Sequence, residues 1–119
     1  KHDEAESCYR RIVAFFETYF GKDHPHLATG LHNLALVLHE QGKFDEAKSL
    51  LDRCLVIRRR VLSDDHPDVA SSLLNLAEVL KAQHNYDEAE PKYRQSVEIF
   101  EKTLGQNHTN VATALNNLA

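Results

Sequence analysis

The stretch KFDEAKSLLDRCLVIRRRVL, residues Lys43–Leu62, decides the fold, because the chain carries its pattern three times. The pattern comes earlier as KHDEAESCYRRIVAFFETYF (1–20) and later as NYDEAEPKYRQSVEIFEKTL (85–104). The shared Asp-Glu-Ala triplet begins at residues 3, 45 and 87, a constant interval of 42. A fixed period without insertions is the mark of a repeat array.

A second segment repeats with the same period between these stretches. It reads HPHLATGLHNLALVLHEQG from His24, HPDVASSLLNLAEVLKAQH from His66 and HTNVATALNNLA from His108. The repeating unit is therefore a pair of segments, and each pair needs its neighbours to bury its apolar face. The last segment stops within the pattern and the chain contains no Met, so we expect a piece excised from a longer array.

Apolar residues recur at spacings of three and four in both segments, which predicts amphipathic helices. We expect helices at about 3–20, 25–41, 45–62, 67–83 and 87–104, and the start of a sixth near residue 109. His24 should cap the second helix, where the missing N–H of Pro25 costs nothing. Asp45 should cap the third, and Gly21 and Gly42 mark helix ends. No strand is expected, because no apolar run alternates with period two.

The apolar stripes of the first three helices give the expected core. They comprise Ala5, Cys8, Tyr9, Ile12, Val13, Phe16 and Phe20; Leu27, Ala28, Leu31, Leu34, Ala35 and Leu38; and Ala47, Leu50, Leu51, Cys54, Leu55 and Val61. Ala35, Ala77 and Ala119 share one repeat position, where a small side chain lets two helices approach closely.

Composition excludes several classes of function. A net charge of −4 gives no electrostatic case for nucleic acid or an anionic membrane. No apolar run approaches the roughly 20 residues of a membrane span. Two cysteines are too few for a disulfide framework, so we expect buried, inert thiols in a cytoplasmic protein.

No motif for catalysis or cofactor binding is present, so we expect no enzyme, no cofactor and no metal site. His24 and His26 flank a proline, but His24 recurs as His66 and His108 and is therefore a repeat feature. Arg58, Arg59 and Arg60 form a basic run with Arg53. A solvated outer face explains that run better than an anion site does, although the anion site stays open.

Two patterns resemble the tetratricopeptide repeat, in the long form found in kinesin light chains. They are Leu-x-x-Leu-Ala-x-x-Leu (Leu31, Leu34, Ala35, Leu38) and Ala-x-x-x-Leu/Tyr (Ala47, Leu51; Ala89, Tyr93). The resemblance implies an all-α fold of antiparallel helix pairs stacked in a right-handed superhelical solenoid. The whole chain, 1–119, would be one array. Residues 1–20 would be the second helix of a preceding repeat, 25–62 and 67–104 full repeats, and 109–119 the start of another.

The resemblance also implies a concave groove lined by the first helix of each pair. Its expected peptide-binding residues are Thr29, His32, Asn33, Leu36, His39, Ser71, Leu74, Asn75, Glu78, Lys81, Asn116 and Asn117. An amide side chain both donates and accepts, so the repeated Asn could bind the backbone of an extended peptide. The alternative is that each Asn bonds to its own helix. His32 and His39 could tune binding with pH, or could be ordinary surface histidines.

We therefore expect a scaffold or adaptor that binds a protein or peptide partner. The alternative is a structural spacer or homotypic assembly module within a larger signalling protein. Val111, Leu115 and Leu118 would lack a covering helix at one end of the array, and the first helix would lack its partner at the other. End-to-end self-association is the expected result.

Overall fold

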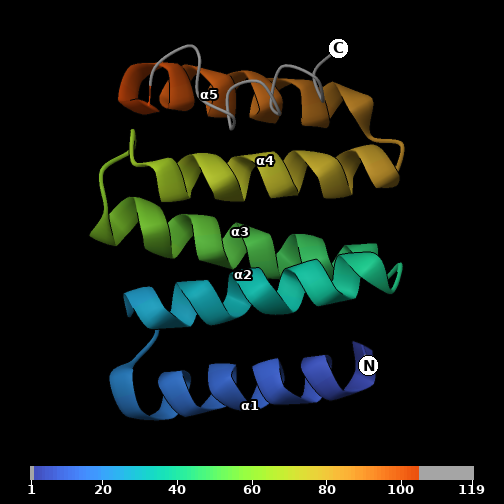
Figure 1. Cartoon of the computed structure of the whole chain (residues 1–119), viewed down its shortest axis with the longest axis vertical. Coiled ribbons are helices and arrows are strands. Elements are labelled where there is room, and N and C mark those ends of the chain that lie inside the picture. Colours follow the sequence, from blue (N-terminus) through green and yellow to red (C-terminus); the bar gives the residue numbers. More distant parts are fainter. Residues whose placement is uncertain (1, 105–119) are drawn as a thin grey trace. The chain divides into compact units, whose positions relative to one another are not determined.

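The computed structural model describes residues 2–104, which form five helices and no strand (Figure 1). The helices are α1 (His2–Phe20), α2 (Pro25–Glu40), α3 (Phe44–Val61), α4 (Pro67–Ala82) and α5 (Tyr86–Leu104). The chain divides into two compact units, Lys1–Val61 and Leu62–Ala119. The expected all-α repeat is confirmed, with helix ends within two residues of those expected. The sixth segment, including Val111, Leu115, Asn116, Asn117 and Leu118, lies outside the described residues.

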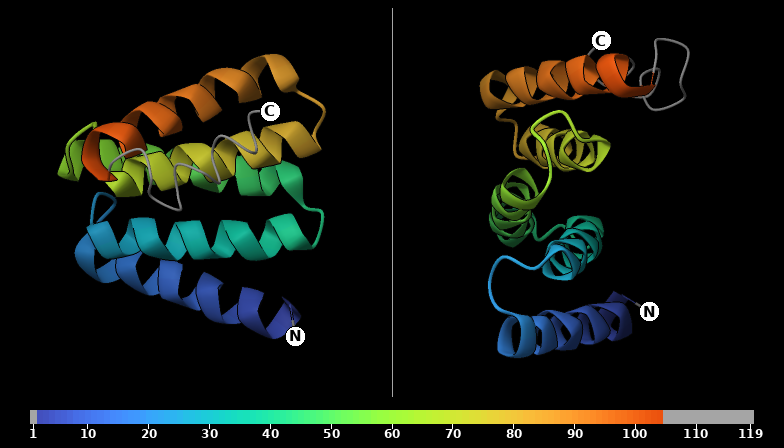
Figure 2. Two further views of the ribbon diagram at one scale, coloured as in Figure 1. Left: turned by 45° about the horizontal axis from the view of Figure 1, so that its top comes forward. Right: turned by 90° about the vertical axis from the view of Figure 1, so that its left-hand side faces the viewer.

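In the first unit, α2 packs against both α1 and α3. Short loops at 21–24 and 41–43 make the neighbouring helices antiparallel, and the right-hand view of Figure 2 shows α3 displaced sideways from α2. Gly30 marks the close approach of α2 to α1. A Cβ added there would lie 3.4 Å from Val13 Cγ2 and 3.5 Å from Ile12 Cγ2.

In the second unit, α4 packs against α5. Leu73, Leu76 and Leu80 of α4 are buried together with Tyr93 and Phe100 of α5. The repeated small residues behave as the sequence predicts: Ala35 and Ala77, one period apart, are both completely buried. Ala119, the third member of the series, lies outside the described residues.

The helix boundaries follow from local chemistry. His24 Nδ1 accepts a hydrogen bond from the His26 backbone N–H at 3.1 Å, and His66 Nδ1 accepts one from the Asp68 N–H at 3.0 Å. Both side chains therefore satisfy a donor that the first turn leaves open, and the expected cap at His24 is confirmed. Asp45 was expected to cap α3, but that helix begins at Phe44, so Asp45 lies in its first turn.

The expected core is correct for α2 and wrong for much of α1. All six residues expected on α2 are buried, as are Ala47, Leu51, Cys54 and Leu55 of α3. On α1 only Val13 is buried, whereas Ile12 is 40% and Phe20 52% exposed. The reason is that α1 packs mainly on α2, which covers only the stripe around Val13. Val61 is 40% exposed because it is the last residue of α3.

Ion pairs join α1 to α3 and to the turn before it. Arg10 Nη1 lies 2.9 Å from Glu46 Oε2, Arg53 Nη2 lies 2.7 Å from Glu17 Oε2, and Lys43 Nζ lies 3.3 Å from Glu6 Oε1. Arg10 also contacts Glu6 at 2.8 Å, and this bond, with help from Lys43, lowers the pKa of Glu6 below its ordinary value. Apart from Glu6 these side chains are about half-exposed, so water screens the pairs and each contributes little to stability.

Candidate functional site

The candidate groove residues of the first unit lie along one side of α2. Their spacing of three to four residues places them on a single helix face. Thr29 is exposed, Leu36 is 36% exposed, and His32, Asn33 and His39 are half-buried. This face therefore offers amide, imidazole and apolar surface without a cluster of charge.

The corresponding face of the second unit lies on α4. Ser71, Leu74, Asn75 and Glu78 are half-buried, and Lys81 is exposed. Asn75 follows Asn33 by one period of 42 residues and has the same intermediate exposure. The first helix of each repeat, α2 in the first unit and α4 in the second, thus presents an accessible Asn beside an accessible Leu. That these residues bind peptide stays a prediction.

Both histidines of the α2 face also contact α3. Arg58 Nη1 lies 3.4 Å from His32 Nδ1, and the His39 ring lies 5.4 Å from the Phe44 ring. Arg58 is only 8% exposed, so it turns inward and does not belong to the solvated basic run expected from the sequence. Arg59 and Arg60 are exposed, in agreement with that expectation.

Glu78 of the α4 face lies close to a buried tyrosine that the sequence did not mark as unusual. Burial, together with the negative charge of Glu78, raises the pKa of Tyr93 to about 12. The Tyr93 hydroxyl is buried and has no hydrogen-bond partner among residues 2–104. In the first unit the equivalent position is Leu51, which is fully buried. A Tyr at this position, shared with Tyr9 of α1 and replaced by Leu51 in α3, was the available signal.

His24 and His26 belong to an aromatic cluster at the end of α1. The His24 ring lies 5.1 Å from the His26 ring, 4.8 Å from Phe20 and 5.8 Å from Phe16. The pair therefore packs against aromatic rings in addition to capping α2. Within residues 2–104, no three His, Cys, Asp or Glu side chains come together in a way that could hold a metal ion.

The two thiols differ in their surroundings. Cys54 is buried, as expected, and its Sγ donates to the Ala28 carbonyl oxygen at 3.2 Å. Cys8 was also expected to be buried but is exposed. It lies on the side of α1 that α2 does not cover, beside Ile12 and Phe15, which is 51% exposed. Tyr19, 70% exposed, continues this apolar face. The apolar stripe expected from the sequence includes neither Phe15 nor Tyr19.

Comparison with known proteins gives one family. The tetratricopeptide repeat model matches residues 1–55, 27–102 and 68–119. No curated protein sequence matches the chain. In the part of the chain described by the structure, no helix is long and apolar enough to cross a membrane.

Among solved structures, the chain is similar to the nearly identical repeats of a Podosopora anserina protein classed as a kinesin light chain. That match has a TM-score of 0.91 and 27% identity and covers 98% of this chain and 56% of the other. BtubC from P. vanneervenii gives a TM-score of 0.87 and 28% identity, over 98% of this chain and 46% of that one. The chain thus spans about half the length of these relatives. The N-terminal domain of C. elegans stress-induced protein-1, at 16% identity and a TM-score of 0.61, shows the fold alone.

Proposed function

The chain belongs to the tetratricopeptide repeat family, and we propose that it is an adaptor whose α2 and α4 faces bind peptide segments of a partner protein. The repeat is a protein-interaction scaffold, and its solved neighbours are kinesin light chain-like. The observation that carries the proposal is that a half-buried Asn, Asn33 on α2 and Asn75 on α4, recurs at the same position of the repeat.

The chemistry of these faces suits an extended peptide. An Asn side chain can donate to a peptide carbonyl and accept from a peptide N–H, whatever the peptide sequence. Leu36 and Leu74 are only partly covered and give apolar side chains a place to bind. Glu78 and Lys81 are the acidic and basic groups of the α4 face, so affinity should depend only modestly on salt.

We propose that the protein catalyses no reaction, binds no cofactor and has no nucleic-acid partner. The net charge of −4 argues against a polyanionic partner. We place the protein in the cytoplasm, which is supported by the two free thiols, Cys8 and Cys54.

The test is to select peptides against the protein from a random library and to map the strongest binder by backbone NMR. Shifts concentrated on α2 and α4 would support the proposal, and shifts confined to α1 or α5 would overturn it. Gln95, an exposed amide on α5, supplies the control: Gln95→Ala should leave affinity unchanged.

A second candidate is homotypic assembly through the exposed apolar face of α1. Ile12, Phe15 and Tyr19 lie three and four residues apart on that face, and each is at least 40% exposed. Sedimentation at rising protein concentration should show growing mass, and Phe15→Glu should abolish the growth. Thr18→Glu, an equal charge change at an exposed position of the same helix, is the control. A constant monomeric mass up to millimolar protein would exclude this candidate.

A further inference from the structure

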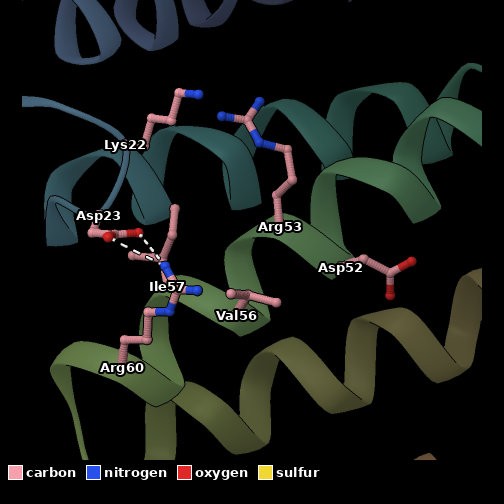
Figure 3. Close-up of a pocket in the computed structure, with 7 residues that line it drawn as sticks. All are labelled: Lys22, Asp23, Asp52, Arg53, Val56, Ile57 and Arg60. Atoms are coloured by element: carbon pink, nitrogen blue, oxygen red, sulfur yellow. Dashed lines mark hydrogen bonds and ion pairs between the residues drawn. The ribbon is translucent and has the colours of Figure 1, made fainter.

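A pocket of 330 Å³ lies in the first unit between the α1–α2 loop and α3, away from the α2 face (Figure 3). Its lining residues are Lys22 and Asp23 of the loop, with Asp52, Arg53, Val56, Ile57 and Arg60 of α3. None of them belongs to the candidate peptide-binding residues.

One cation of this pocket, Lys22, remains unpaired among the described residues once the ion pairs of its charged residues are assigned. Asp23 pairs with Arg60 at 3.1 Å, and Asp52 pairs with Lys48 at 3.2 Å. The Lys22 ammonium makes no ion pair or hydrogen bond within residues 2–104. Arg53 uses one N–H for Glu17, and a guanidinium carries five. Figure 3 shows Lys22 and Arg53 extending to the same side of the pocket and Asp52 pointing away from them.

The pocket also offers apolar surface. Val56 is 50% exposed although it is a large aliphatic residue in the middle of a helix. Ile57 is almost completely buried but contributes to the lining. An incoming group therefore meets the unpaired Lys22 ammonium and the remaining N–H groups of Arg53, beside an accessible valine.

The second unit shows which of these features the repeat itself requires. The ion pair between Asp23 and Arg60 recurs one period later as Asp65 and Lys102, at 3.7 Å. Ile57 also recurs, as the buried Ile99, but the other features do not recur in the second unit. Lys22, Arg53 and Val56 are replaced by Asp64, Gln95 and Glu98, all exposed. Both units thus have the ion pair between the loop and the helix, whereas the second unit lacks the cations and the valine at the positions of Lys22, Arg53 and Val56.

From this contrast we propose that the pocket is a second binding site, which accepts an acidic, aliphatic peptide segment of a protein partner. The carboxylate of an Asp or Glu binds Lys22 and the unused N–H groups of Arg53. A neighbouring aliphatic side chain covers Val56. Because this site shares no residue with the α2 and α4 faces, it does not depend on the function proposed for them.

The test titrates a capped Leu-Glu-Leu-Glu-Leu peptide into the full chain, followed by backbone NMR. Gln in place of Glu, and Gly in place of Leu, give the two matched control peptides. The acidic aliphatic peptide should shift Lys22, Arg53 and Val56, and both controls should bind about tenfold more weakly. Equal binding of all three peptides, or shifts confined to α2 and α4, would overturn the proposal.

The variants copy the residues that the second unit has at the equivalent positions, where the same repeat fold already tolerates them. Lys22→Asp, Arg53→Gln and Val56→Glu should each fold normally and weaken the peptide about tenfold. Arg59→Gln is the control for general charge, since Arg59 is exposed on the same helix but does not line the pocket, and it should change affinity less than about twofold. If Arg53→Gln and Arg59→Gln lose the same affinity for the peptide, the attraction is non-specific and the proposed site is refuted.

Discussion

Tyr93 lies in an environment that does not suit its polar hydroxyl group. Its side chain is 3% exposed, and its hydroxyl has no hydrogen-bond partner within residues 2–104. A buried hydroxyl that loses its water without gaining a partner is destabilising. Glu78 adds a negative charge nearby, which further disfavours the ionised phenol.

Tyr93→Phe should therefore leave stability unchanged or raise it by roughly 1 kcal/mol, and should reduce its dependence on alkaline pH. Folding raises the pKa of Tyr93 from 10.0 to about 12, so the folded chain holds this proton more tightly than the unfolded chain does. Stability must then fall as pH rises from about 10 to about 12. Urea unfolding at pH 8 and pH 11 measures both effects. A wild type and variant that lose the same stability at pH 11 would contradict this assignment.

Ala77 is completely buried, in a position where the sequence repeats alanine. Ala77→Leu should destabilise the second unit by about 1–3 kcal/mol, because the added carbons must displace packed neighbours. Thermal unfolding gives the comparison, and Ala82→Leu is the control because Ala82 is half-buried at the end of α4. A melt of Ala77→Leu that matches the wild type would show that no close helix approach exists there.

At the scale of the element, a histidine is the N-cap residue of α2 and of α4, a role that histidine seldom has. His24 and His66 accept from the backbone as Asn, Asp or Ser usually do. Pro25 and Pro67 follow them, and a proline at that position needs no N–H partner. The His-Pro pair therefore encodes where the helix begins.

His66→Ala should cost about 1 kcal/mol, and His66→Asn should retain most of the stability because its side-chain oxygen can accept the same hydrogen bond. Chemical unfolding of the two variants beside the wild type tests this. If Asn is as damaging as Ala, the hydrogen bond at the cap is not how His66 stabilises α4.

Sequence patterns predicted helix boundaries well because caps and turn residues act over three or four residues. Gly42 ends α2 with φ of 81°, and His84 at the same position ends α4 with φ of 64°. Periodicity alone failed on α1, where the helical stripe includes Ile12 and Phe20. Spacing shows which residues share a face, whereas burial depends on which helices are there to cover it.

At the scale of the molecule, the 42-residue period predicted the fold and the candidate faces but not the pocket. Asn33 and Asn75 could be found because they recur. Lys22, Arg53 and Val56 are not repeated in the second unit, and their position around one cavity is what connects them. Lys22 is distant in sequence from Arg53 and Val56, so the pattern of the sequence does not bring the three together.

Asn75→Ala should weaken a bound peptide by about 1–2 kcal/mol, which is typical of a lost hydrogen bond to a peptide group. Folding should barely change, because Asn75 lies off the buried stripe of α4. Calorimetric titration with the selected peptide, alongside melts of both proteins, separates the two effects. If affinity is unchanged and stability falls strongly, Asn75 stabilises the fold and does not bind the peptide.

The ion pairs of the first unit restrict how such a chain can gain or lose repeats. If recombination removed one period, α1 would face the residues that follow its present partners by 42 positions. Arg10 would meet Glu88 in place of Glu46, so that pair would survive. Glu6 would meet Asn85 in place of Lys43, and Glu17 would meet Gln95 in place of Arg53. The repeats are alike in pattern, but two of these three ion pairs hold only between the present neighbours.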